Sequence, residues 1–358
     1  MIVPILAAAI DTTPKTIHKF FGPMVTGVTV SHTGRVFANF PRWGDPVVNS
    51  VVEIKGGKES AYPNAAWNAP GKGPNRFVCV QSVVVDPKDR LWVVDAAAPN
   101  LADTLPGAPK LVCVDLATNR VTRVIHFPES VVHATSYLND VRFDYTRGPK
   151  GYAFITDSSS KGPNAIIVVD LATGTSWRRL NAHPSVKPEP GYVPVVEGQK
   201  LMMRKRYGTP TPAKLGSDGI AIVPKQDKLY YCPLTSPRLY SVPISMLVNR
   251  RMKDEDVANA VVDEGTKGPS DGMIASVTGT LFVTDYVRHQ VKRRETDGSY
   301  VSVIQLKSYE WPDTLSIGPD GWLYVTANQL QRQKAYQVVD KRMKPYRLVR
   351  ARVGAMAQ

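Results

Sequence analysis

The chain has 358 residues, of which 43% are hydrophobic, and its 45 Lys and Arg residues outnumber its 31 Asp and Glu residues to give a formal charge of +14 at pH 7. Such a positive charge is common in proteins that bind nucleic acid. No DNA- or RNA-binding motif accompanies it, so we expect no nucleic-acid partner. The 26 glycines and 29 prolines are spread along the chain and indicate many turns between short strands.

The N-terminal stretch, residues 1–10, is apolar but short, and it runs directly into Asp11. It has the character of a trimmed export signal, so we treat residues 1–14 as an N-terminal extension and expect a secreted or periplasmic protein. No later stretch reaches the roughly 20 apolar residues that span a bilayer, so we expect no membrane span. The cysteines, Cys79, Cys113 and Cys232, have no metal-binding spacing, and we expect them to be reduced and buried.

Internal repetition is the strongest signal in the sequence. Six segments share a short alternating strand, a polar turn and a second β-branched or aromatic strand, which is the pattern of a hairpin. They span residues 26–40, 81–96, 139–158, 218–233, 271–286 and 313–328. A third strand follows each hairpin and a fourth follows several. Repeated four-stranded units bury their faces against neighbours, and closing them into a ring hides the open edges. The sequence therefore predicts an all-β fold, a six-bladed β-propeller.

One domain accounts for residues 15–358, and residues 15–21 supply a strand that fastens the last blade to the first. The interval between the third and fourth hairpins holds an insertion at about residues 183–215, rich in Pro and Gly. A loop this long in a compact fold is functional or disordered, so this segment is either a lid over the channel or a solvated excursion.

The first residue of each hairpin occupies one equivalent position. These six polar residues are Thr26, Gln81, Asn139, Asp218, Asp271 and Asp313. Since the innermost strands of a propeller line its axis, we expect their side chains to converge at one mouth of the channel. Short polar residues also form local turns at strand entries, which is the simpler interpretation. It explains less well why three carboxylates share one ring, because crowded carboxylates raise one another's pKa unless a cation intervenes.

The ring supports two kinds of chemistry. A divalent cation, Ca²⁺ first and Mg²⁺, Mn²⁺ or Zn²⁺ as alternatives, would find oxygen ligands in Asp218, Asp271 and Asp313. Such an ion would polarise a carbonyl and lower the pKa of a bound water. Without a metal, a carboxylate could take a proton from a carbon next to a carbonyl. In either case Asp271, Asp218 and Asn139 are the expected catalytic residues.

We expect Gln81, Thr26 and Trp311 to bind substrate. The segment 268–272 fits the Gly-x-Ser-x-Gly pattern literally, but it opens a strand instead of joining a strand to a helix. A nucleophilic Ser270 is therefore not expected.

Four segments carry a family resemblance: GSDGIAI (216–222), LYYCPLTSPRLY (229–240), SDGM (270–273) and WPDTL (311–315). With them the chain resembles the major royal jelly protein/Yellow family from about Val25 to Gln337. The resemblance implies a six-bladed propeller, often exported, with members that bind biogenic amines in the channel and members credited with dopachrome tautomerisation.

The chain is also distantly similar to the senescence-marker/gluconolactonase propellers, which bind a divalent metal at the channel and hydrolyse sugar lactones. Asp218 and Asp271 match two of their later metal positions, and Asn139 matches an Asn that binds substrate or water. Thr26 departs from that pattern, because it stands where the first blade has an acidic ligand.

Three functions remain open at this stage. The first is a monomeric small-molecule enzyme that hydrolyses a lactone-type carbonyl substrate with metal assistance. The alternatives are a Yellow-type dopachrome tautomerase and a binder of biogenic amines or other small ligands that performs no chemistry.

Overall fold

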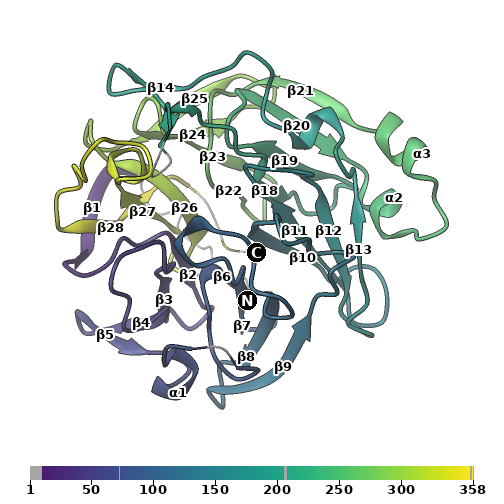
Figure 1. Ribbon diagram of the computed structural model, residues 1–358, viewed down its shortest axis with the longest axis horizontal. Coiled ribbons are helices and arrows are strands. Elements are labelled where there is room, and N and C mark those ends of the chain that lie inside the picture. The colour runs from purple at the N-terminus through teal and green to yellow at the C-terminus, as the bar shows by residue number, and fades with distance from the viewer. Residues whose placement is uncertain (1–9, 72, 205–207, 355–356, 358) are drawn as a thin grey trace, which may run out of the picture.

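Six four-stranded antiparallel sheets stand around one central axis in the computed structural model (Figure 1). The structure describes residues 10–71, 73–204, 208–354 and 357. The apolar residues 1–9, on which the export prediction depends, lie outside the described residues. The prediction of a six-bladed β-propeller is confirmed.

Each of the first five blades consists of four strands that follow one another in the sequence, from the axis outward. The first three blades contain β2 (Gly27–Val30), β3 (Val36–Asn39), β4 (Val51–Lys55) and β5 (Lys58–Ala61); β6 (Val80–Val85), β7 (Arg90–Asp95), β8 (Lys110–Asp115) and β9 (Arg120–His126); and β10 (Leu138–Asp144), β11 (Tyr152–Asp157), β12 (Ile166–Asp170) and β13 (Ser176–Arg179). The next two contain β18 (Ser217–Ile222), β19 (Leu229–Pro233), β20 (Arg238–Val242) and β21 (Val262–Thr266); and β22 (Met273–Ala275), β23 (Leu281–Asp285), β24 (Gln290–Arg294) and β25 (Tyr300–Gln305).

The sixth blade joins the two ends of the described chain. Its inner strands are β26 (Trp311–Ile317), β27 (Trp322–Asn328) and β28 (Tyr346–Arg352), and its outer strand is β1 (Asp11–Phe20). The register runs from Asp11 opposite Arg352 to Phe20 opposite Tyr346. The closing strand lies where the sequence predicts one, but it begins at Asp11 instead of Lys15. Pairing the first strand with the last removes an open edge and closes the ring.

The inner strands approach one another closely at the axis. A Cβ atom added to Gly219 would lie 2.2 Å from the carbonyl oxygen of Asp271, and one added to Gly272 would lie 2.3 Å from that of Asp313. Only glycine allows this approach of backbone to backbone. Gly219 and Gly272, which directly follow Asp218 and Asp271 in the sequence, are therefore packing requirements of the ring.

Hydroxyl groups tie neighbouring blades together at the same level. The Thr156 hydroxyl donates to the carbonyl oxygen of Asp218 at 2.8 Å, and the Thr326 hydroxyl donates to that of Thr26 at 2.7 Å. The second of these bonds joins the sixth blade to the first. Each threonine also accepts a hydrogen bond from an amide of its own blade, Asp140 or Thr314. The inner strands that begin near Asp218 and Thr26 are thus each tied to the preceding blade.

A change of register interrupts the inner hairpin of four blades at the ring position. It falls between Val80 and Ser82, Leu138 and Val141, Ser217 and Ile220, and Pro312 and Leu315. Such bulges re-aim a side chain that strict alternation would send elsewhere. They turn the strand entries toward the axis while the rest of each strand keeps its apolar faces in the core.

The remaining elements lie outside the six blades. Three short helices are α1 (Ala65–Asn68), α2 (Ile244–Val248) and α3 (Asp254–Asn259), and two small hairpins in the predicted insertion are β14 (Val195–Val196) with β15 (Gln199–Lys200) and β16 (Met202–Met203) with β17 (Thr211–Pro212). In the part of the chain that the structure describes, no helix has the length and apolar character needed to cross a membrane. The three cysteines are free and buried, as predicted.

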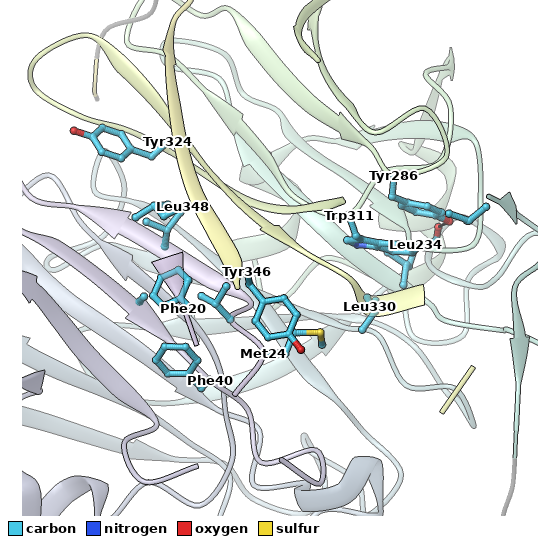
Figure 2. Close-up of a cluster of buried hydrophobic side chains, with 14 of the residues drawn as sticks. Phe20, Met24, Phe40, Leu234, Tyr286, Trp311, Tyr324, Leu330, Tyr346 and Leu348 are labelled. Carbon is cyan, nitrogen blue, oxygen red and sulfur yellow. Dashed lines mark hydrogen bonds between the residues drawn. The ribbon is translucent and has the colours of Figure 1, made fainter. Parts of the chain in front are cut away.

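Phe20 provides a test of ring closure. Its buried ring packs edge-on against Phe40 at a centroid distance of 5.5 Å and lies with Leu348 in one apolar cluster (Figure 2). We expect Phe20→Ala to lower the free energy of unfolding by about 3–5 kcal/mol, because it leaves a cavity in the closing blade. The neighbouring Phe21 is 68% exposed, so Phe21→Ala should stay within about 0.5 kcal/mol of the wild type. Denaturant unfolding of both variants measures this, and equal losses would contradict it.

Candidate functional site

A cavity of about 770 Å³, including its open mouth, lies at the end of the axis where the inner strands begin. Five of the six predicted ring residues line it: Gln81, Asn139, Asp218, Asp271 and Asp313. Thr26 is not among the described lining residues. Its hydroxyl donates to the carbonyl oxygen of Gln81 at 3.3 Å and accepts from the Asn39 amide at 3.0 Å. In this structure Thr26 joins the first two blades, and its contact with substrate stays a prediction.

Three carboxyl groups are brought together at the bottom of the cavity. Asp218, Asp271 and Asp313 are only 4%, 8% and 6% exposed. Burial, reinforced by the neighbouring acids, raises the pKa of Asp218 and Asp313 well above the usual range. Burial also raises the pKa of Asp271, to about 7. Near neutral pH the group therefore holds protons, and Asp271 is the member poised between its two forms.

A fourth carboxyl group, missed in the sequence analysis, belongs to the same cluster. Asp140 is buried next to Asn139, and its charge raises the pKa of Asp218, Asp271 and Asp313. The guanidinium of Arg142 lies 3.9 Å from Asp140 and lowers the pKa of that carboxyl, which burial otherwise raises. The bulge between Leu138 and Val141 breaks the alternation of β10, which is why strand periodicity did not reveal Asp140.

Trp311 lies behind Asp271. The indole Nε1 donates to Asp271 Oδ2 at 2.6 Å, and this bond lowers the pKa of the carboxyl against the effect of burial. The indole stacks on the ring of Tyr286, with a centroid distance of 3.9 Å and an interplanar angle of 6° (Figure 2). Trp311 is fully buried and is not among the described lining residues. The structure thus places Trp311 against a carboxyl group of the site, and its contact with substrate stays a prediction.

Amide and aromatic side chains form one wall of the cavity. Gln81 donates from Nε2 to Asn139 Oδ1 at 2.9 Å and accepts at Oε1 from the Tyr137 hydroxyl at 2.9 Å. The Tyr137 hydroxyl in turn accepts from Nε1 of Trp43 at 2.6 Å, and Asn139 donates to the Ser158 hydroxyl at 3.1 Å. Because each group has a partner, the wall is held in one arrangement before any ligand arrives.

Segments far apart in the sequence surround the mouth. The insertion contributes Met203 and Leu215, and the loop after β27 contributes Leu330 and Tyr336. The backbone amide of Arg204 donates to the carbonyl oxygen of Ala335 at 2.8 Å, which joins these two segments. The part of the insertion that the structure describes therefore contributes to the cavity wall, while residues 205–207 lie outside that description.

The carboxyl groups of the cavity bear on the divalent cation that the sequence predicts. Among the described residues, no group of three or more His, Cys, Asp or Glu side chains is arranged to hold a metal ion. Trp311 already occupies Asp271 Oδ2, and Asn328 occupies Asp313 Oδ2 at 2.7 Å. Asp218 Oδ1 is buried without a hydrogen-bond partner in the described part of the chain. The raised pKa values of these carboxyl groups favour their protonated forms in this arrangement.

Ser270 occupies the site that the Gly-x-Ser-x-Gly pattern marks. It is fully buried, and its hydroxyl lies 3.3 Å from both the carbonyl oxygen of Gly272 and the hydroxyl of Thr284. It precedes strand β22 and lies in no strand–turn–helix junction, so it has the setting of a structural serine.

The sequence analysis missed the aromatic wall and the residues of the mouth. Tyr137, Trp43 and Tyr336 come from loops that carry no repeat signal. Tyr137 alone had a local clue, since it lies two residues before the ring position Asn139.

Comparison with known proteins identifies the family. The family model for "Major royal jelly protein" matches residues 78–358. The chain belongs to the major royal jelly protein family. It is 25% identical over 272 residues to major royal jelly protein 3 of Apis mellifera, a match that covers 71% of this chain and 46% of that protein. The chain thus spans about half the length of the royal jelly proteins that it matches.

Two relatives from Drosophila melanogaster carry names of enzymes. Dopaminechrome tautomerase is 25% identical over 294 residues, covering 75% of this chain and 60% of that protein. L-dopachrome tautomerase yellow-f is 22% identical over 327 residues, covering 83% of this chain and 72% of that protein.

Solved structures of other members of the wider fold group resemble this chain in shape. A calcium-binding regucalcin from Agrobacterium tumefaciens superposes with a TM-score of 0.56 at 14% identity, covering 96% of this chain and 97% of that one. A gluconolactonase from Xanthomonas campestris superposes with a TM-score of 0.55 at 11% identity, covering 94% of this chain and 89% of that one. At such low identity the likeness concerns the fold alone.

The bond from Trp311 to Asp271 has a measurable consequence. We expect Trp311→Phe to raise the pKa of Asp271 above about 7, because it removes a hydrogen bond that favours the charged carboxylate. Carboxyl ¹³C chemical shifts followed against pH measure this.

Trp92 offers a matched control. Its Nε1 donates to Asp86 Oδ2 at 2.7 Å, and neither residue is among those described as lining the cavity. Trp92→Phe should leave the titration of Asp271 unchanged. An equal shift in both variants would mean that the effect comes from general loosening of the blades.

Proposed function

We propose that the protein is a tautomerase that moves a proton within a small carbonyl or iminium compound of the aminochrome type. The observation that carries this proposal is the pairing of two buried carboxyl groups of different proton affinity. Asp271 has a pKa of about 7, near the optimum for a general base, and Asp218 keeps its proton. Moving a proton between two positions of one molecule needs a base that accepts a proton and an acid that donates one.

The steps follow from the positions of the two acids. Oδ2 of Asp271 is held by Trp311, which leaves Oδ1 to take the proton from a carbon next to the carbonyl or iminium group. Asp218 donates its proton to the oxygen at which negative charge develops. Asp271 then returns the abstracted proton to Asp218, its neighbour in the cluster of carboxyl groups. The substrate isomerises with no net gain or loss of protons, water or electrons.

The wall residues bind and orient the substrate. The Asn139 amide nitrogen carries two N–H bonds, of which the Ser158 hydroxyl takes one, and we assign the other to a substrate oxygen. Tyr137 and Tyr336 present aromatic surface to a flat ring, and burial raises the pKa of both phenols so that they stay neutral. Gln81 is hydrogen-bonded to both Tyr137 and Asn139 and so fixes their positions relative to each other.

The names of the two Drosophila relatives support an aminochrome as the substrate. The partial coverage of the curated relatives keeps the identity of the substrate a proposal. Action as a monomer and export to a secreted or periplasmic location belong to the same proposal; the latter depends on residues 1–10.

A second candidate is hydrolysis of a lactone with a divalent cation, Ca²⁺ first, and it was the leading expectation from the sequence. The buried, unpaired Asp218 Oδ1 favours it, since a cation could engage that atom. A third candidate, a binder of cationic amines without catalysis, uses the same carboxyl groups as counter-charges.

Replacement of Asp271 tests the proposed reaction. We expect Asp271→Asn to lower kcat for L-dopachrome or dopaminechrome by about two or more orders of magnitude, because the amide cannot accept the proton. KM should change little, since the shape of the side chain is kept. Asp297→Asn, which alters a fully exposed carboxylate, serves as control and should retain activity. Wild-type protein that binds amines but turns over neither compound would contradict the proposal.

Metal binding separates the first two candidates. We expect isothermal titration calorimetry to show no binding of Ca²⁺, Mg²⁺, Mn²⁺ or Zn²⁺ at millimolar concentration to the cavity, and tautomerisation to continue in a chelator. Binding that Asp218→Asn abolishes, together with metal-dependent hydrolysis of aldono-lactones, would favour the second candidate instead.

A further inference from the structure

An ion pair crosses the mouth of the cavity. The ammonium of Lys161, on the loop between β11 and β12, bonds to Asp103 Oδ1, on the loop between β7 and β8. Both residues line the cavity, and their side chains are 57% and 51% exposed. Exposed pairs of this kind are weak and exchange readily with other partners. The pair is therefore a contact that a charged ligand could replace.

The backbone holds Lys161 at this position. The hydroxyl of Ser159 accepts hydrogen bonds from the amides of Lys161 and Gly162, both at 3.0 Å. The Thr135 hydroxyl donates to the carbonyl oxygen of Gly162 at 2.8 Å. Asn164 donates to the carbonyl oxygens of Asp157 and Ser159 at 3.0 and 2.8 Å. The base of the lysine side chain is thus fixed at the rim, while its charged end lies in solvent.

The loop that carries Asp103 is held in a less common conformation. Asn100 and Leu101 have φ values of 59° and 55°, in the left-handed region that costs energy for residues other than glycine. The Asn100 amide donates to the carbonyl oxygen of Arg42 at 2.8 Å, and the Thr104 amide donates to that of Ala134 at 2.9 Å. Such strain is kept where surrounding contacts over-determine it, and it is found near ligand sites.

Lys161 differs in the sign of its charge from the other ionised groups described as lining the cavity. Among the described residues that line the cavity, Lys161 is the only cation, and the acidic side chains are Asp103 and the three deep carboxyl groups. A substrate that carries an anionic group would be repelled by the deep carboxylate unless a cation met that group. Lys161 is the residue in position to do so, because it lines the cavity and its side chain is 57% exposed.

We infer that Lys161 is a specificity-determining residue that binds an anionic group of the substrate, and that Asp103 competes with this group for the same ammonium. The inference rests on the proposed tautomerase function and narrows its substrate class. The compounds in the names of the two Drosophila enzymes differ by one such group: L-dopachrome carries a carboxylate on the ring that dopaminechrome lacks. The protein prefers the carboxylated compound.

Two substitutions with opposite effects test the inference, with kcat/KM measured for L-dopachrome and for dopaminechrome. We expect Lys161→Gln to lower kcat/KM for L-dopachrome by about 10- to 100-fold, the scale of one lost hydrogen bond to a charged group. The value for dopaminechrome should stay within about twofold. Asp103→Asn should raise kcat/KM for L-dopachrome, because it frees the ammonium.

A matched control is Lys228→Gln. Lys228 bonds to Glu264 at 2.8 Å, is 41% exposed and is not among the described lining residues. It should change neither value. Equal losses for both substrates in Lys161→Gln, no change in either, or a loss in Asp103→Asn would overturn the inference.

A binding measurement keeps the inference testable if the wild type turns over neither compound. Calorimetry with indole-2-carboxylate and with indole compares an anionic and a neutral flat ring. Wild-type preference for the carboxylate that Lys161→Gln removes would support the role of Lys161 even though the proposed reaction had failed. Equal affinity for the two compounds in the wild type would overturn it.

Discussion

The close approach of six inner strands at one axis is the constraint on which the rest of the structure depends. Gly219 and Gly272 let neighbouring backbones come within contact of Asp271 and Asp313. Thr156 and Thr326 then fix that approach with hydrogen bonds between blades. Side chains at the strand entries have no room to spread apart, so residues separated by long stretches of sequence meet at one end of the channel. The site is therefore a consequence of ring closure, which pairs the first described strand with the last.

Burial and the closeness of neighbouring acids determine the proton affinity of the carboxyl groups in the cavity. Carboxyl groups exposed on a surface would ionise independently, whereas here burial and neighbouring acids favour the neutral forms. The indole of Trp311 works against this tendency at one carboxyl only, which separates Asp271 from Asp218 and Asp313 in proton affinity. Fold relatives named for calcium binding or lactone hydrolysis share the overall shape. In this chain burial raises the pKa of the acids, and hydrogen bonds from Trp311 and Asn328 engage two of them.

The cavity divides its tasks between strands and loops. The entries of the inner strands supply the acids and amides, held by the tightest packing in the molecule. The loops supply the aromatic wall, the described part of the insertion and the charged pair at the mouth. This division is common in folds whose rigid framework supports variable loops.

The sequence by itself determined the number of blades and a ring of six polar residues, five of which line the cavity. It could do so because hairpin periodicity and the repeated strand entry are local patterns that do not depend on tertiary contacts. It also determined that the cysteines are buried thiols. Only the tertiary structure decided which partner each ring residue meets. Thr26 bonds to Asn39 and the second blade, Trp311 lies behind Asp271, and Asp140 joins the acids through a bulge. Lys161 reaches the mouth from a loop without any repeat signal. These outcomes depend on bulges and on contacts between residues far apart in the chain, and strand periodicity carries no information about either.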